Sequence, residues 1–247
     1  ARQVSLDIMN LVVDYGNSQA KVGIFKQFDL IQQHTFSDAV ELKSFLQNFS
    51  AENFILSSVI HDSAKVLDWV SHIKRKFILT ASLPLPISNL YATPQTLGGD
   101  RLASVCGTHQ KFPGSHCLVI DAGTCIKYDF LDKDGQYHGG AISPGLKMRF
   151  QAMHQFTAKL PLVEIVEDPK LIGNTTETSL QSGALNGAVA EMNGIILQYE
   201  QKFEGLQVIL SGGDEPFFVN KVKRPIFALP ELVLSGLNSI LIYNVGD

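Results

Sequence analysis

The chain has 247 residues, of which 45% are hydrophobic, and its formal net charge is -4 at pH 7. This length is enough for one large domain or two modest ones with an ordinary apolar core. A small negative charge gives no overall attraction to nucleic acid or to an anionic membrane surface, so no nucleic-acid partner is expected and local groups must hold any anionic ligand.

The apolar runs are short, and the cysteines lack a metal-binding pattern. No run approaches the roughly 20 residues that span a bilayer, so no membrane segment is expected. Cys106, Cys117 and Cys125 have no C-x-x-C spacing, and we expect them to be buried small side chains. An odd number of cysteines, with no signal-peptide pattern at the start of the chain, favours a reducing cytoplasm.

The N-terminal part predicts three strands, a helix, a strand, a helix and a strand, in that order. Their ranges are 11–14, 20–25, 30–36, 37–49, 54–59, 63–73 and 77–79. Ser37 is the expected N-cap of the first helix, which is predicted to end at Phe49. A hairpin and a third strand, followed by alternating strands and helices, predict a mixed sheet with helices on its faces.

The opening of the chain recurs in its second half. The run from Leu118 to Thr124 repeats the pattern of the run from Leu11 to Asn17, which is an apolar strand, an Asp, and a turn with Gly followed by Thr or Asn. The elements predicted after the second run are two strands, a long helix and a strand, at 127–131, 137–142, 178–203 and 207–210. The halves share one plan, so we expect domains at 1–114 and 115–247.

An Asp at a strand end, followed by a Gly-containing turn, suits phosphate binding. Such a turn presents backbone N–H groups and a hydroxyl to phosphate oxygens. Asp14 suits a hydrated Mg²⁺, and Lys21 can neutralise phosphate charge. One copy alone could be an ordinary turn, but two copies favour paired hairpins that grip one nucleotide. The chain contains neither G-x-x-x-x-G-K-[ST] nor a G-x-G-x-x-G after a strand, which argues against a P-loop or dinucleotide site.

A second candidate region runs from Tyr91 to Arg101, between the two halves. Its glycines allow close backbone approach, and Asp100 and Arg101 begin a helix predicted to reach about His109. Both residues are catalytic candidates. The alternative is structural: Asp100 would be a first-turn acid favoured by the helix dipole, and Arg101 a solvated charge.

This region resembles the Y-x-x-P-x-x-L-G-x-D-R signature of type III pantothenate kinases at every defined position. Other family patterns also occur, in order, across most of the chain. They are D-x-G-N-[ST]-x-x-K at Asp14–Lys21, D-x-G-T at Asp121–Thr124, G-G-x-I-x-P-G at Gly139–Gly145 and G-x-x-T at Gly173–Thr176. The resemblance implies an α/β fold of two ribonuclease-H-like domains of the actin/hexokinase/Hsp70 ATPase superfamily, with mixed sheets, flanking helices and internal duplication.

The resemblance also implies a role for each matching residue. The ATP site is expected at Asp14, Tyr15, Gly16, Asn17, Ser18, Gln19, Ala20, Lys21 and Thr124. The pantothenate site is expected at Tyr91, Gly98, Gly99, Asp100, Arg101 and Thr176. Asp100 would accept a proton, Thr176 would come from the partner in a homodimer, and Asp121 would bind a monovalent cation, K⁺ or NH₄⁺.

The implied reaction is ATP-dependent phosphorylation of pantothenate to 4'-phosphopantothenate, the first step of coenzyme A biosynthesis. Two residues depart from the family pattern: Cys125 stands where Ala is usual, and Lys127 where a small polar residue is common. Two alternatives remain: a kinase of the same superfamily for a sugar or short acid, and a non-catalytic ATP-binding regulator. The Tyr91–Arg101 block argues against the first, and the intact acidic and basic site residues argue against the second.

Overall fold

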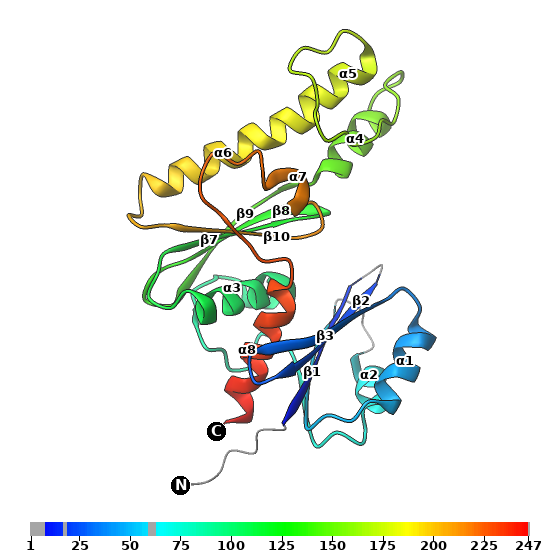
Figure 1. The fold of residues 1–247 in the computed structure, drawn as a ribbon, viewed down its shortest axis with the longest axis vertical. Helices are drawn as coiled ribbons and strands as arrows, with labels where there is room; N and C mark the ends of the chain where they lie inside the picture. Colours follow the sequence, from blue (N-terminus) through cyan, green and yellow to red (C-terminus); the bar gives the residue numbers. More distant parts are fainter. Residues whose placement is uncertain (1–7, 17–18, 59–62, 247) are drawn as a thin grey trace. The chain divides into compact units, whose positions relative to one another are not determined.

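The computed structural model describes residues 8–16, 19–58 and 63–246, and it shows an α/β protein (Figure 1). The chain forms two compact units. Unit 1 comprises residues 1–113, 135–137 and 231–247, and unit 2 comprises 114–134 and 138–230. This division differs from the expected halves 1–114 and 115–247, chiefly because the C-terminal segment folds with unit 1.

Unit 1 contains a five-stranded mixed sheet with the strand order β3-β2-β1-β4-β5. The strands are β1 Met9–Tyr15, β2 Ala20–Lys26, β3 Asp29–Phe36, β4 Asn53–Ser58 and β5 Arg75–Ile78. The first three are antiparallel, and β1, β4 and β5 run parallel. The predicted mixed sheet is confirmed. The other elements of unit 1 are α1 Ala39–Asn48, α2 Ser63–Trp69, β6 Ser88–Asn89, a 3-10 turn at Pro94–Thr96, α3 Gly99–Lys111 and α8 Leu232–Val245.

Strand β1 shows how both faces of this sheet are covered. Leu11 and Val13 join an apolar cluster that includes Leu42 and Leu46 of α1. Val12 points the other way, into a cluster that includes Leu237 of α8. Alternate side chains of a strand lie on opposite faces, and both faces of β1 are buried. This explains the uninterrupted apolar run that the sequence has there.

Helix α1 begins one residue later than predicted. Asp38, and not Ser37, is its N-cap, because Asp38 Oδ1 accepts a hydrogen bond of 2.6 Å from the backbone N–H of Val40. A carboxylate at this position also interacts favourably with the positive end of the helix dipole. The expected N-cap at Ser37 is therefore wrong.

The C-terminal helix α8, which the sequence patterns did not predict, crosses α3 in unit 1 at very short range (Figure 1). Two glycines make the crossing possible. A Cβ at Gly236 would overlap the carbonyl oxygen of Ala103, and a Cβ at Gly107 would lie 2.9 Å from the carbonyl oxygen of Leu232. The backbones are therefore in contact, so α8 fixes the position of α3.

A chain of buried amides connects α8 to the sheet of unit 1. Asn53 donates to Asn10 Oδ1 and Asn10 donates to Asn238 Oδ1, both at 2.8 Å. Asn238 in turn donates to the backbone oxygen of Gln27 at 2.7 Å. All three asparagines are at most 3% exposed. Each buried amide thus has a partner, which is the condition for burying such groups at low cost.

Unit 2 repeats the strand plan of unit 1. Its strands are in the order β11-β10-β7-β8-β9, with β7 antiparallel to β8 and parallel to β10, and β10 parallel to β11. The bounds are β7 Cys117–Ala122, β8 Cys125–Leu131, β9 Gln136–Pro144, β10 Gln207–Ser211 and β11 Phe227–Ala228. The first residues of β9, Gln136 and Tyr137, belong to unit 1 and pair with β6. The internal duplication is confirmed.

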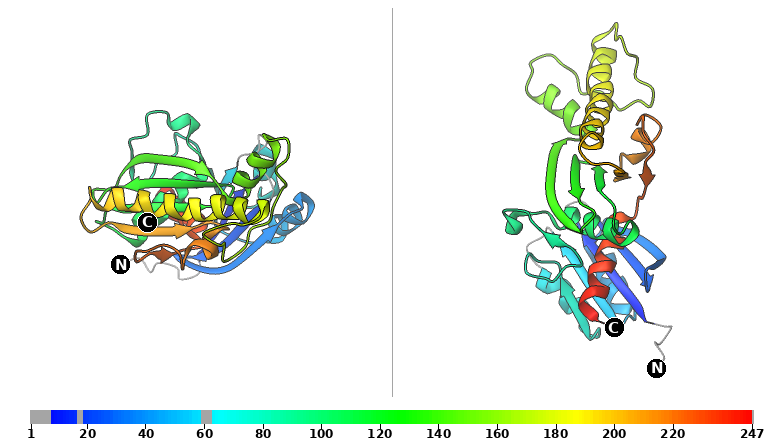
Figure 2. Two further views of the ribbon diagram at one scale, coloured as in Figure 1. Left: turned by 90° about the horizontal axis from the view of Figure 1, so that it is seen from above. Right: turned by 90° about the vertical axis from the view of Figure 1, so that its left-hand side faces the viewer.

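One long helical run covers the sheet of unit 2 (Figure 2). It consists of α5 Thr176–Gln181, a π-helical turn at Ser182–Asn186 and α6 Gly187–Glu200, in place of the predicted helix at 178–203. Two further helices are α4 Leu146–Gln155 and α7 Glu215–Phe218. Met192 and Ile196 of α6 share a core with Leu118 and Ile120 of β7. Among the described residues, no helix is long and apolar enough to cross a membrane.

Candidate active site

The first phosphate-binding candidate is the hairpin turn between β1 and β2 in unit 1. Asp14 lies directly opposite Lys21 in the register of the two strands. The backbone N–H of Gly16 donates to the carbonyl oxygen of Gln19 at 3.1 Å, which closes the turn. The expected ATP contacts at Asn17 and Ser18 lie outside the described residues.

The acceptor candidate region places Arg101 in a buried, aromatic environment. Arg101 is only 6% exposed, and its guanidinium carbon lies 5.5 Å from the centroid of the Tyr91 ring. Tyr91 stacks against Tyr137 with ring centroids 6.1 Å apart. A cation over an aromatic face is attracted by the ring quadrupole. Arg101 is thus buried, and the alternative that it is a solvated charge is wrong.

Asp100 lies in the first turn of α3, where two glycines leave room around it. Its Oδ1 accepts a hydrogen bond of 2.9 Å from the backbone N–H of Arg101. A Cβ at Gly98 would lie 2.6 Å from Asp100 Oδ1, and a Cβ at Gly99 would lie 2.9 Å from Ser57 Oγ. Any larger residue at either position would displace the carboxylate or the helix.

The contact between Gly99 and Ser57 brings the two candidate regions of unit 1 together. Ser57 is the register partner of Asp14 in the parallel pair of β4 and β1. Asp14 and Asp100 therefore lie at the same edge of the sheet, at the carboxyl ends of β1 and β4. Ligands of open α/β sheets characteristically bind at this edge.

In unit 2, the corresponding turn lies between β7 and β8. Its backbone is closed by a hydrogen bond of 3.0 Å from Gly123 N–H to the carbonyl oxygen of Cys125. Thr124 is exposed at the tip. Lys127 Nζ lies 2.6 Å from Asp121 Oδ2, and the two side chains are 17% and 18% exposed. The described part of the chain has no cluster of three or more His, Cys, Asp or Glu that could hold a metal ion.

Two other loops of unit 2 pack against this turn. Gly145 donates its N–H to the carbonyl oxygen of Thr124 at 3.1 Å, and Asp214 donates its N–H to that of Ala122 at 2.9 Å. Gly212 has a φ of 98°, and a Cβ there would overlap the Ala122 oxygen. A non-glycine residue at Gly212 would therefore be both strained and obstructed.

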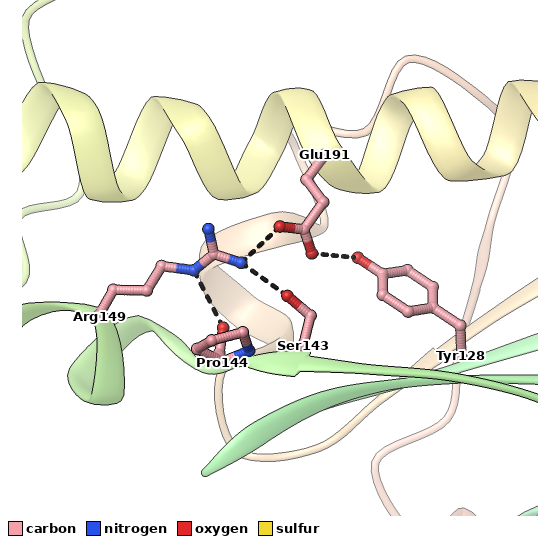
Figure 3. Close-up of polar contacts among 5 residues, drawn as sticks. All are labelled: Tyr128, Ser143, Pro144, Arg149 and Glu191. Carbon is pink, nitrogen blue, oxygen red and sulfur yellow. Dashed lines mark hydrogen bonds and ion pairs between the residues drawn. The ribbon is translucent and has the colours of Figure 1, made fainter. Parts of the chain in front are cut away.

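A network of charged and polar side chains holds Ser143 and Pro144, the residues directly before Gly145 (Figure 3). Arg149 donates to the Pro144 carbonyl oxygen at 3.0 Å, to Ser143 Oγ at 2.9 Å and to Glu191 Oε2 at 2.6 Å. Tyr128 donates to Glu191 Oε1 at 3.3 Å. Burial alone would raise the pKa of the Glu191 carboxyl, but hydrogen bonds from Ser143 and Arg149, with the charge of Arg149, hold the pKa below its usual value.

The structure places Thr176 apart from the other predicted site residues of unit 2. It is the first residue of α5 and is exposed. The side chain of Thr175 caps α5 through a capping box with Thr178. Thr176 lines a surface cavity of about 700 Å³ together with residues that include Met153 and Leu180, but not Asp121 or Thr124.

Sequence reasoning gave no role to the loops that pack on the turn between β7 and β8. The signals in the sequence were the family pattern G-G-x-I-x-P-G, which ends at Gly145, and the run Ser211-Gly212-Gly213-Asp214 after a predicted strand. Burial raises the pKa of the Asp214 carboxyl, and the charge of Lys147 partly opposes this rise. The network around Arg149 left no local pattern, because its members come from four separate elements, β8, β9, α4 and α6.

The family model and the relatives in the sequence comparison all point to type III pantothenate kinases. A family model described as type III pantothenate kinase matches residues 10–198. The chain is 43% identical over 241 residues to a type III pantothenate kinase of Bacteroides fragilis, covering 96% of this chain and 99% of that protein. It is 44% identical over 239 residues to one from Phocaeicola vulgatus, again covering 96% and 99%.

The fold also resembles solved kinases. A glucokinase from an Antarctic psychrotroph superposes with a TM-score of 0.54 at 12% identity, covering 96% of this chain and 99% of that one. At this identity the likeness concerns the fold alone. The family model matches most of the chain, and the relatives are 43% and 44% identical over 96% of it. The chain therefore belongs to the type III pantothenate kinase family.

Proposed function

We propose that this protein transfers the γ-phosphate of ATP to the primary hydroxyl of pantothenate, which gives 4'-phosphopantothenate and begins coenzyme A biosynthesis. The observation that carries the proposal is the joint placement of Asp14 and Asp100 at one sheet edge, within a chain that has the family signature from Tyr91 to Arg101. One residue is suited to the nucleotide side and the other to the acceptor side.

The nucleotide side is assigned to the two hairpin turns. Exposed Thr124 and the backbone N–H groups of the turns suit phosphate oxygens, and Lys21 supplies positive charge. Asp14 fits a hydrated Mg²⁺, because this ion takes one or two carboxylates and keeps water and phosphate oxygens as its other ligands. Mg²⁺ would neutralise phosphate charge. The residues proposed to contact ATP are Asp14, Tyr15, Gly16, Asn17, Ser18, Gln19, Ala20, Lys21 and Thr124.

The acceptor side is assigned to the start of α3 and its surroundings. Asp100 orients the pantothenate hydroxyl and accepts its proton late, since phosphoryl transfer usually passes through a loose transition state. Arg101, held against Tyr91, hydrogen-bonds an oxygen of pantothenate. Most of the rate enhancement would then come from positioning. The residues proposed to bind pantothenate are Tyr91, Gly98, Gly99, Asp100, Arg101 and Thr176.

Asp121 is the one residue to which the family resemblance assigns binding of a monovalent cation. A carboxylate next to the phosphate-binding turn would repel ATP unless a positive charge is close to it. The proposed function therefore requires a cation at Asp121, and it does not require any particular source of that cation.

We also propose that the protein acts as a homodimer in which Thr176 completes the pocket of the partner. Two large apolar side chains stand exposed shortly before Thr176 in the sequence: Leu171 and Ile172 are 82% and 81% exposed. Exposed apolar residues that are close together often mark a protein interface. The three free cysteines suit the reducing cytoplasm in which such an enzyme would work.

A direct comparison of acceptors tests the proposal. Formation of ADP and of the phosphorylated product is measured with pantothenate, with hexoses and with short carboxylic acids, each at several concentrations. We expect pantothenate to give the highest kcat/KM by at least about a hundredfold, because a site built for several polar groups strongly rejects analogues that lack them. Preference for a hexose or a short acid would refute the proposal.

A further inference from the structure

Each half of the fold places a lysine opposite the Asp of its phosphate-binding turn. In unit 1, Lys21 is the register partner of Asp14. In unit 2, Lys127 is the register partner of Asp121, and the two form an ion pair of 2.6 Å. Paired residues of an antiparallel hairpin project from the same face of the sheet. The register of the hairpin therefore holds the ammonium group at the Asp121 carboxylate.

The residues around Asp121 do not fit a bound monovalent cation while Lys127 is in this position. Lys127 covers Oδ2, and Oδ1 faces the backbone of Gly212, where a Cβ would lie only 2.5 Å away. The carbonyl oxygens of Ala122 and Thr124 already accept hydrogen bonds from the neighbouring loops. A K⁺ ion needs several oxygen ligands at once, and here the Lys127 ammonium group already occupies one side of the Asp121 carboxylate.

We infer that the Lys127 ammonium group takes the place of the monovalent cation at Asp121, so that activity of this protein does not depend on K⁺ or NH₄⁺. The inference replaces the expectation that Asp121 binds such an ion. An ammonium group resembles NH₄⁺ in charge and in hydrogen-bonding capacity. It neutralises the carboxylate beside Thr124, and a covalently attached cation requires no ion from solution.

The departure of Lys127 from the family pattern agrees with this inference. A small polar residue at this position, which is common in the family, would leave space beside Asp121 that an ion could fill. Because a buried or half-buried carboxylate without a partner is costly, either a lysine or an ion must be present. The lysine and the ion are then alternatives, and this chain has the lysine.

Cation dependence of the wild type and of Lys127→Ala provides the test. Phosphopantothenate is measured directly, because coupling enzymes can respond to K⁺ themselves. Each protein is assayed with Mg²⁺ and ATP in KCl, NH₄Cl, NaCl or choline chloride at one ionic strength. The activity readout rests on the proposed function.

For the wild type, we expect rates that agree within about twofold among the four salts. For Lys127→Ala, we expect a rate in choline that is lower by about tenfold or more, mainly through the KM for ATP, and recovery in KCl or NH₄Cl. Lys133→Ala is the matched control. Lys133 is exposed at the opposite end of the same hairpin, so this variant should behave as the wild type does.

Melting temperatures give a second readout that needs no substrate. We expect KCl or NH₄Cl to raise the melting temperature of Lys127→Ala relative to choline chloride, because only the variant has a site for the ion. The wild type and Lys133→Ala should show no such difference. This readout decides the inference even if the protein phosphorylates another acceptor.

Three results would overturn the inference. The first is a wild type that needs K⁺ or NH₄⁺ for activity. The second is a Lys127→Ala variant that keeps its full rate in choline. The third is a folded Lys127→Ala variant that no cation restores, since Lys127 would then act on the phosphate itself. A wild type inactive with pantothenate in every salt would instead refute the proposed function and leave the melting comparison intact.

Discussion

At the residue scale, the proposed mechanism depends most on the charge of Asp100. Asp100→Asn keeps the size of the side chain but removes the proton acceptor, so we expect kcat to fall by about 10²- to 10⁴-fold, or roughly 3 to 5 kcal/mol. The KM for ATP should change little, because Asp100 lies on the acceptor side. Steady-state kinetics would measure kcat and the KM for ATP, and a thermal melt would show whether the variant is folded. A folded variant with near-normal kcat would show that Asp100 is not the base.

Arg101 should contribute mainly to acceptor binding. We expect Arg101→Ala to raise the KM for pantothenate more than it lowers kcat, because the guanidinium contacts the acceptor in both ground and transition states. Arg101→Lys keeps the charge but loses the planar group over Tyr91, so it should recover only part of the binding. Equal KM values for Arg101→Ala and the wild type would remove Arg101 from the pocket.

The Glu191 network predicts a pH-dependent contribution to stability. The pKa of Glu191 is lower in the folded protein than its ordinary value of 4.5, so the folded state favours the ionised carboxyl. Its contribution is complete above about pH 4.5 and is lost as the pH falls through the folded-state pKa. We expect Glu191→Gln to cost about 1 to 2 kcal/mol at pH 7, and less at pH 4 and below.

Urea unfolding of both proteins across this pH range would measure the difference. Because other titrating groups are common to both proteins, their effects cancel in the comparison. A stability difference that stays constant from pH 7 to pH 3 would contradict an ionic role for Glu191.

The sequence could identify the residues with a local signature but not their surroundings. Asp100 and Arg101 stand out because they begin a helix after two glycines. The burial of Arg101 against Tyr91 could not be predicted, since it depends on Tyr137, a residue far along the chain. Arg149 and Glu191 had no signature for the same reason: 42 positions separate them in the sequence.

At the scale of elements, the contact between α3 and α8 holds the proposed base in position. Gly236→Ala would force a methyl group into the carbonyl oxygen of Ala103, so we expect a loss of stability of about 3 kcal/mol. Gly194→Ala in α6 is the control, because no described heavy atom outside that helix lies within 4 Å of a Cβ there. It should be neutral or stabilising by up to about 1 kcal/mol. Denaturant unfolding would compare the variants, and equal stabilities would argue against the close crossing.

The strands around the site were predictable, whereas α8 was not. Strands β1 and β7 end at turn residues and lie between polar segments, so their apolar runs have clear limits. The segment 232–242 is mostly apolar and has no charged residue, and its polar residues Ser235, Asn238 and Ser239 have helical spacing but are small, so the helical pattern is weak. Its helical state and its position follow from packing against α3 and β1, which is a tertiary effect.

At the scale of the whole molecule, the assignment of Thr176 concerns a second copy of the chain. No local pattern can show that a residue acts in the pocket of a partner. What the structure of one chain supplies is an exposed Thr176 at a capped helix start, close in sequence to the exposed side chains of Leu171 and Ile172. We therefore expect a dimer in sedimentation at assay concentrations, and an active monomer would exclude the proposed arrangement.

Mixed dimers would test whether Thr176 acts across the interface. Thr176→Trp should block the pocket of the partner without disturbing the fold of its own subunit. The Thr176 side chain is exposed, and the helix cap is formed by Thr175 and Thr178. Each homodimer, of Thr176→Trp or of Asp100→Asn, should be nearly inactive. In a heterodimer of the two, purified through two different tags, one pocket would combine an intact Asp100 with an intact Thr176. We expect about half of the wild-type rate per dimer. If Thr176 instead serves its own subunit, both pockets of the heterodimer contain a defect, and the rate should stay as low as in the homodimers.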